Sequence, residues 1–157
     1  MTTKKKTLAV ILGSVTAAAA LYGLTPKHEG TVLKTYKDMG GVLTYCTGAT
    51  EDAQWGKTYT KEECRSQLDY DLARHAEGML KCTKVPLTEG QKIAFTDFTF
   101  NVGVSAYCSS TVARKANQGD VKGSCDALLM WDKVNGKPVK GLTNRRQEER
   151  KICLAST

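Results

Sequence analysis

The sequence predicts a single, mostly α-helical domain of the α+β class with a small β-containing part. Two segments begin with a threonine followed three residues later by Glu or Gln, at Thr60 and Thr88, which is the pattern that caps a helix start. A Gly-Gly turn signal within residues 38–45 precedes a short run typical of a strand. The chain has 157 residues, which is enough for one domain with a hydrophobic core.

The first 26 residues differ in composition from the rest of the chain. Residues 4–6 are three lysines, and residues 7–26 are twenty positions without a charge. At about 1.5 Å per residue, a helix of that length spans the roughly 30 Å hydrocarbon core of a bilayer. The lysines predict that the N-terminus starts in the cytoplasm and that the rest is exported. We therefore divide the chain into an export segment, residues 1–26, and a folded domain, residues 27–157.

Helical patterns dominate the folded domain after the predicted strand. A helix is expected from Thr60 to about Lys81, because apolar residues recur there at spacings of four. The helix that starts at Thr88 is apolar on much of its surface, so we expect it to be buried and its aromatic residues to be core residues. Shorter helices are expected over residues 109–118 and 122–131, then a turn at 135–138. The last helix, 143–154, carries charges spaced for ion pairs.

Three polar residues, on a predicted helix, the turn and the strand that follows it, indicate a chemical reaction. Glu29, Asp38 and Thr44 are separated by nine and six positions. A carboxyl group on a helix, a second at a turn and a hydroxyl on the following strand can converge across one cleft. Cleavage of a glycosidic bond uses such groups, because one carboxyl group protonates the leaving oxygen while an ionised group stabilises positive charge or activates water. The alternative is that Glu29 and Asp38 are ordinary surface carboxylates, two of sixteen acidic residues.

Together with two later motifs, this trio resembles the catalytic signature of the bacteriophage lysozyme (muramidase) family. The later motifs are Phe100-Asn101-Val102-Gly103 and Gly141-Leu142-x2-Arg145-Arg146-x2-Glu149-x3-Cys153. The resemblance extends over almost everything from Lys27 onward. It implies a two-lobed lysozyme-like fold, with a small β-hairpin lobe, a connecting helix and a larger helical lobe. It also implies that Glu29 is the general acid, that Asp38 and Thr44 hold the attacking water, and that the reaction inverts the sugar configuration.

Within this family, the sequence resembles the signal-anchor-release endolysins of lambdoid-type phages. The implied reaction is hydrolysis of the β-1,4 bond between N-acetylmuramic acid and N-acetylglucosamine in peptidoglycan, by a monomer without a cofactor, for host lysis. A holin is the implied functional partner. Two alternatives stay open: a peptidoglycan-binding protein without turnover, and a lytic transglycosylase that uses Glu29 without Asp38. We interpret the arginines at 145 and 146 as a structural salt-bridge element.

Three interpretations of residues 7–26 stay open. The three alanines at 18–20 fit a signal-peptidase site, and a permanent anchor is the second interpretation. The third is a signal-anchor-release segment, which holds the enzyme at the periplasmic face of the host inner membrane and later escapes intact to the periplasm. Small residues favour it. Because Glu29 lies three residues beyond Pro26, an embedded helix would pin the acid beside the bilayer. Residues 7–26 contain no cysteine, so we expect control by topology without a thiol switch.

The cysteines predict disulfides in an oxidising compartment. Their number is even, none has the C-x2-C spacing of a metal site, and two histidines are too few to indicate a zinc cluster. Six cysteines allow about fifteen pairings. In the related phage lysozymes the usual cysteines match 46, 64, 125 and 153, which leaves 82 and 108 as an added pair. The resemblance thus implies the pairs Cys46–Cys64, Cys82–Cys108 and Cys125–Cys153.

The net charge of +7 indicates an anionic partner. The basic residues are scattered and do not form a patch interleaved with aromatic residues, so we do not expect a nucleic-acid partner. A bacterial envelope is also anionic. An enzyme that acts on the envelope therefore accounts for the charge.

Overall fold

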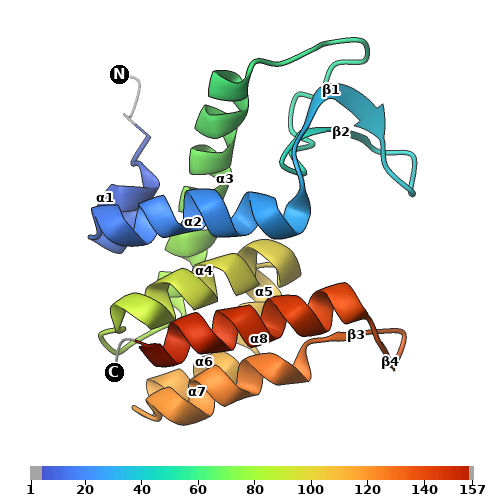
Figure 1. The fold of residues 1–157 in the computed structure, drawn as a ribbon. Coiled ribbons are helices and arrows are strands. Elements are labelled where there is room, and N and C mark those ends of the chain that lie inside the picture. The colour runs from blue at the N-terminus through green and yellow to red at the C-terminus, as the bar shows by residue number, and fades with distance from the viewer. Residues whose placement is uncertain (1–4, 156–157) are drawn as a thin grey trace.

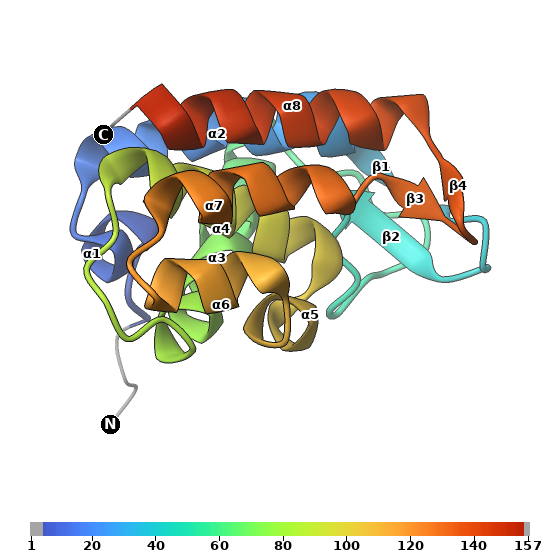
Figure 2. The ribbon, with the colours of Figure 1, turned by 90° about the horizontal axis from the view of Figure 1, so that it is seen from below.

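The computed structural model describes residues 5–155, so that Lys4 of the basic leader lies outside the described residues. A small β-containing lobe and a larger helical body are joined by α3 (Lys61–Lys81) (Figure 1). Helix α4 (Glu89–Val102) runs through the middle of the body, with α2 (Val15–Glu29) packed on one side and α8 (Lys140–Ala155) on the other (Figures 1 and 2). The predicted fold class, mostly helical with a small β lobe, is confirmed.

The small lobe is a β-hairpin with a loop folded against it. Strands β1 (Val32–Lys37) and β2 (Leu43–Cys46) pair antiparallel. The loop over residues 47–59 returns to the other edge of β1, where it makes further backbone hydrogen bonds. The rings of Tyr45 and Tyr59 stack at a centroid distance of 4.4 Å and form the small core of this lobe.

Both predicted capping positions start helices. The side chain of Thr60 accepts a hydrogen bond from the backbone of Glu63 at the start of α3. At the start of α4, Thr88 and Gln91 exchange side-chain and backbone hydrogen bonds, so the reciprocal capping box is complete there. The remaining elements are α5 (Val104–Cys108), α6 (Thr111–Asn117), α7 (Val121–Ala127), a 3-10 turn (Leu128–Met130), β3 (Lys133–Val134) and β4 (Lys137–Pro138).

Two boundaries in the second half differ from the predicted ones. The helix expected over residues 122–131 ends at Ala127, and the 3-10 turn takes its place. The last helix begins at Lys140 rather than 143. The predicted turn is the tip of the β3–β4 hairpin, where Asn135 and Gly136 take the positive φ angles of 51° and 78° that this turn needs.

Helix α4 supplies the centre of the large core, as predicted. Phe95 and Phe98 are fully buried. Their rings lie against Tyr107 at centroid distances of 5.9 and 6.4 Å, and Phe98 also meets Trp131 edge-on at 5.4 Å. The aromatic residues of α4 are therefore core residues.

The uncharged N-terminal segment forms two helices instead of the single helix expected. Helix α1 (Leu8–Leu12) ends at Gly13, which takes a left-handed φ of 65°. Ser14 then caps α2 by accepting a hydrogen bond from the backbone of Ala17. Among residues 5–155, the structure contains no helix with the length and apolar character needed to span a bilayer.

Both N-terminal helices bury their apolar side chains in the large core. Leu8, Leu12, Leu21 and Leu24 are at most 6% exposed and belong to the same cluster as the residues of α4. Full burial of one leucine side chain contributes about 1.5–3 kcal/mol. In this structure α1 and α2 are thus part of the folded body, and α2 continues across the expected boundary between residues 26 and 27.

Carboxylates of the body accept hydrogen bonds from polar groups of the same segment. The hydroxyl of Tyr22 donates to Asp69, and burial followed by this bond raises the pKa of Tyr22 to about 12. The hydroxyls of Ser14 and Thr16 each donate to Glu89 at 2.5 Å. The segment is therefore held by directional contacts as well as by apolar packing.

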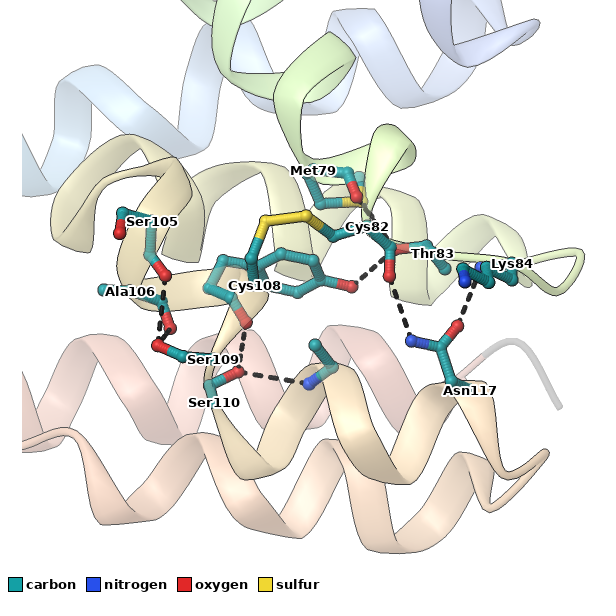
Figure 3. The surroundings of a disulfide bond; sticks show 12 residues. Met79, Cys82, Thr83, Lys84, Ser105, Ala106, Cys108, Ser109, Ser110 and Asn117 are labelled. Atoms are coloured by element: carbon teal, nitrogen blue, oxygen red, sulfur yellow. Dashed lines mark hydrogen bonds between the residues drawn. A yellow bond between two sulfur atoms is a disulfide. The ribbon is translucent and has the colours of Figure 1, made fainter.

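The structure has the disulfide pairing that the resemblance implied: Cys46–Cys64, Cys82–Cys108 and Cys125–Cys153. Figure 3 shows the Cys82–Cys108 bond, which joins the end of α3 to α5. Both of its cysteines are partly exposed, whereas the other four are buried. Beside it, the hydroxyls of Thr83 and Tyr107 hydrogen bond at 2.7 Å, and the side-chain amide of Asn117 donates to the carbonyl of Cys82 at 2.9 Å (Figure 3).

Removing the Cys82–Cys108 bond should lower the stability of the large lobe. Its cysteines are 26 positions apart, and chain entropy for such a loop corresponds to about 3.5 kcal/mol. We expect the double variant Cys82→Ser, Cys108→Ser to lose about 3 kcal/mol of unfolding free energy, measured by guanidinium denaturation without reductant. The control, Ser105→Ala on exposed α5, should change it by less than about 0.5 kcal/mol. Equal stability of the double variant and wild type would contradict this account.

Candidate active site

Glu29 lies at the junction of the two lobes. It is the last residue of α2, and Gly30 turns the chain with a φ of 77°, so that β1 starts at Val32. The carboxylate oxygen Oε1 accepts a hydrogen bond from Nη1 of Arg145 on α8 at 2.5 Å. The side chain of Glu29 is partly exposed while Arg145 is buried. The Glu29 carboxylate thus has one oxygen held by Arg145 and is partly open to solvent.

Arg145 is itself fixed by a buried carboxylate. Its Nε and Nη2 donate to Oδ2 and Oδ1 of Asp97 on α4, each at 3.0 Å, in the two-pronged geometry that a guanidinium and a carboxylate favour. The hydroxyl of Thr25 donates to Oδ1 of the same carboxylate at 2.7 Å. Burial alone lowers the pKa of Arg145, but Asp97 and then Glu29 outweigh it and raise that pKa above its usual value. The arginine is therefore a permanently charged, rigid donor aimed at Glu29.

Asp38 and Thr44 meet at the tip of the β1–β2 hairpin through the backbone of Val42. The N–H of Val42 donates to Oδ1 of Asp38 at 2.9 Å. The carbonyl of Val42 accepts from the backbone N–H of Asp38 at 2.9 Å and from the hydroxyl of Thr44 at 3.0 Å. Asp38 is exposed and Thr44 is buried. The hairpin thus fixes both side chains relative to one another.

The three predicted site residues form two groups in the structure. Asp38 and Thr44 share the hairpin tip, and Glu29 stands at the base of the same hairpin. Among the hydrogen bonds of the described residues, none joins the Glu29 carboxylate to either of the other two. The two groups are linked through the backbone, because α2 ends at Glu29 and β1 begins at Val32.

A hollow of about 670 Å³ opens beside Glu29, between the end of α2, the end of α4 and the first turns of α8. Asp38 and Thr44 do not line it. Of the residues in the Phe100-Asn101-Val102-Gly103 motif, Asn101 lines it and Gly103 does not. The lining residues are Lys27, His28, Glu29, Asn101, Val139, Gly141, Leu142, Asn144, Arg145 and Glu148.

Glu148 ties the end of α2 to α8 at the edge of this hollow. Its oxygens lie 2.9 Å from Nζ of Lys27 and 2.9 Å from Nε2 of His28. Burial raises the pKa of Glu148, but its hydrogen bonds to these two residues prevail and the pKa is lowered. The carboxylate therefore holds the helix end that carries Glu29.

Arg146 fits the structural role expected for the double arginine, whereas Arg145 contacts the candidate acid. Arg146 donates to both oxygens of Glu149, at 2.5 and 2.8 Å, and to Asn101. Both charged side chains are fully buried, and this burial raises the pKa of Glu149 and lowers that of Arg146. Arg146 and Glu149 are both on α8, and the bond from Arg146 to Asn101 joins this helix to α4.

Sequence reasoning missed the roles of Asp97 and Arg145. The signal was present in residues 93–99, where Asp97 is the one acidic residue in an otherwise uncharged, buried stretch. A carboxylate in such a place needs a partner, because an unpaired buried charge is strongly unfavourable. That partner, Arg145, comes from a helix 48 positions later. In residues 5–155 the structure contains no group of three or more His, Cys, Asp or Glu side chains suited to a metal ion.

The two-lobed fold, with a carboxylic acid fixed at the junction of its lobes, is that of a lysozyme-type hydrolase. The chain belongs to the phage lysozyme family, whose model matches residues 26–149. Its expected fold and family are therefore both confirmed.

Two relatives and one solved structure illustrate this kinship. The chain is 42% identical to a SAR-endolysin of Enterobacteria phage P21 over 156 residues, covering 96% of this chain and 94% of the relative. It is 41% identical to a SAR-endolysin of Bacteriophage PS119, covering 96% and 93%. Among solved structures, a mutant of P22 lysozyme superposes with a TM-score of 0.80 at 31% identity, covering 86% of this chain and 95% of that one.

Loss of the buried carboxylate of Glu149 should cost far more stability than loss of a half-exposed carboxylate that also pairs with an arginine of α8. Glu149→Gln leaves Arg146 buried without its anion, and we expect a loss of about 3–5 kcal/mol. The matched control is Asp126→Asn, which breaks the half-exposed ion pairs of Asp126 with Arg150 of α8 at 2.7 Å and with Lys122 at 2.8 Å and should cost at most about 1 kcal/mol. Guanidinium denaturation of both variants measures the difference. Similar losses would show that the buried pair is not a special constraint.

Proposed function

We propose that this protein is a phage endolysin that hydrolyses the β-1,4 bond between N-acetylmuramic acid and N-acetylglucosamine in peptidoglycan. The observation that carries the proposal is the Glu29 carboxyl group, held by buried Arg145 at the edge of an open hollow in a member of the phage lysozyme family. The SAR-endolysins that resemble the chain over nearly its full length support the same function.

Glu29 is the general acid in this mechanism. Its Oε1 accepts from Arg145, so Oε2 carries the proton that passes to the oxygen of the leaving sugar. Proton transfer of this kind contributes roughly 10²–10⁴-fold to the rate. The hollow beside the acid holds part of the glycan chain.

Asp38 and Thr44 position the attacking water. One oxygen of Asp38 is occupied by the backbone N–H groups of Gly40 and Val42, at 2.8 and 2.9 Å, so the other is left to accept from water. The hydroxyl of Thr44 donates to the Val42 carbonyl, so its oxygen accepts from the same water. A water that donates both protons turns its lone pair outward toward the sugar. Attack on the face opposite Glu29 inverts the configuration, without a cofactor.

The N-terminal segment controls when this chemistry starts. Residues 7–26 hold the precursor at the periplasmic face of the host inner membrane, and the protein then moves to the periplasm as a monomer. The uncharged segment behind a lysine leader and the names of the relatives support this sequence of events. While α1 and α2 lie in the bilayer, Glu29 cannot reach Arg145 on α8. Depolarisation by a holin is the release signal.

Replacement of Glu29 by Gln should abolish cell-wall lysis while leaving the fold intact, because the amide is not acidic enough to transfer a proton to the leaving oxygen. Asp38→Asn and Thr44→Val should lower the rate by roughly 10²–10³-fold through loss of the bound water. The measurement is release of reducing sugar from purified walls, with circular dichroism as the control for folding. Mass spectrometry of the products separates hydrolysis from transglycosylation, which leaves an anhydro-sugar. A folded Glu29→Gln protein that still clears walls would refute the assignment.

Release without cleavage predicts a full-length soluble enzyme. Membrane and periplasmic fractions are collected before and after depolarisation, and the intact mass of the protein is measured in each. We expect the complete chain to move to the soluble fraction as activity appears. A soluble form shorter by about twenty residues would instead identify a cleaved signal peptide, and control by topology would be wrong.

A further inference from the structure

Thr25 and Glu29 bring the end of α2 to the same buried ion pair. They are four positions apart in the helix, so both side chains project from one face. Thr25 donates to Asp97 at 2.7 Å, and Glu29 accepts from Arg145 at 2.5 Å. Arg145 and Asp97 are joined by two hydrogen bonds of 3.0 Å. The four side chains form a closed unit of three helices.

Asp97 links Thr25 to Arg145 within this unit. Its side chain is fully buried, so its oxygens depend on protein donors alone. Oδ1 accepts from Thr25 and from Nη2 of Arg145, while Oδ2 accepts from Nε of Arg145. The Thr25 hydroxyl therefore sets the plane of the carboxylate, and the carboxylate sets the plane of the guanidinium that reaches Glu29.

We propose that Asp97 is a positioning residue. It couples the packing of α2 against the body, called here the seating of α2, to the placement of the general acid Glu29: Thr25 contacts Asp97, and Asp97 holds Arg145. The catalytic meaning of this coupling rests on the function proposed above. The contacts themselves are independent of it, so the two are tested separately.

The coupling gives residues 7–26 a chemical means of control. Thr25 belongs to that segment, and its hydroxyl is one of two donors to Oδ1 of Asp97. When the segment lies in a bilayer, this donor is absent and Arg145 loses the restraint on its partner. Seating of α2 restores the donor and brings Glu29 to the guanidinium in the same step, because both residues are on the same helix turn.

Charge balance is the second part of the role of Asp97. Lys27 and His28 pair with Glu148, and Arg146 pairs with Glu149, which also contacts Asp97 and faces Arg145. Asp97 is the carboxylate that pairs directly with Arg145 beside Glu29. Without Asp97, the remaining carboxylate hydrogen-bonded to Arg145 among the described residues is Glu29 itself.

The test compares two hydroxyl–carboxylate contacts of the same segment in the full-length soluble protein. Thr25→Val and Asp97→Asn disturb the proposed coupling. The matched controls, Thr16→Val and Glu89→Gln, remove a contact of 2.5 Å between the start of α2 and α4 that has no link to Arg145. Thr25→Ser is the rescue variant, because it keeps the hydroxyl.

We expect Asp97→Asn to lower kcat by roughly tenfold or more with little change in KM, because misplacement of a reacting group affects the chemical step. Thr25→Val should lower kcat in the same way, Thr25→Ser should restore it, and the double variant should be no worse than Asp97→Asn alone, which is the non-additivity of coupled residues. Thr16→Val and Glu89→Gln should keep the wild-type kcat, KM and pH profile.

Exchange of the Arg145 Nε–H proton, followed by NMR, is the readout that does not depend on activity. We expect slow exchange in wild type, fast exchange in Thr25→Val and slow exchange in Thr16→Val. Equal exchange in Thr25→Val and wild type, or equal kcat losses in Asp97→Asn and Glu89→Gln, would overturn the coupling. Slow exchange that Thr25→Val abolishes, in a wild-type protein without activity on cell walls, would uphold the coupling and refute the proposed function.

Discussion

The structure depends on a buried ion pair, Arg145 with Asp97, placed where three helices meet. Charges inside a protein are tolerated only when paired and hydrogen-bonded, so this pair restricts how α2, α4 and α8 approach one another. The same guanidinium donates from Nη1 to Glu29. A constraint that the fold must satisfy for its own stability thereby also fixes the acid at the junction of the lobes, where the hollow opens.

Under the proposed function, the N-terminal segment has to suit two environments. Its twenty uncharged positions suit a bilayer, and its leucines fill the core of the soluble fold. The hydroxyl groups of the segment distinguish the folded body from the bilayer, because the folded body supplies carboxylates that accept hydrogen bonds from them. In the folded body three carboxylates accept hydrogen bonds from them, Glu89 near the start of α2, Asp69 in the middle and Asp97 near the end. A helix of leucine and alanine alone would lack these directional contacts.

Much of the fold was predictable from local signals. Capping threonines fix the starts of α3 and α4, and the apolar surface of the second helix identified the core. The family resemblance implied the disulfide pairing found in the structure. The break at Gly13 and Ser14 had a sequence signal, a helix-ending glycine beside a capping serine, that the uncharged composition obscured. Within the site, the spacing of Glu29, Asp38 and Thr44 identified the candidates. The link through Asp97 and Arg145 was not predictable, because it is a tertiary contact between residues 48 positions apart.

In the proposed mechanism, α2 packs against the body in the active enzyme and is separated from it in the membrane-bound form. Backbone hydrogen exchange of residues 15–29, measured with activity on the soluble and the vesicle-bound full-length protein, tests this most directly. We expect the soluble, active protein to protect the α2 amides as strongly as those of α4. Fast exchange throughout α2 in a fully active soluble enzyme would contradict this mechanism, because Glu29 would then be active without α2 packed against the body.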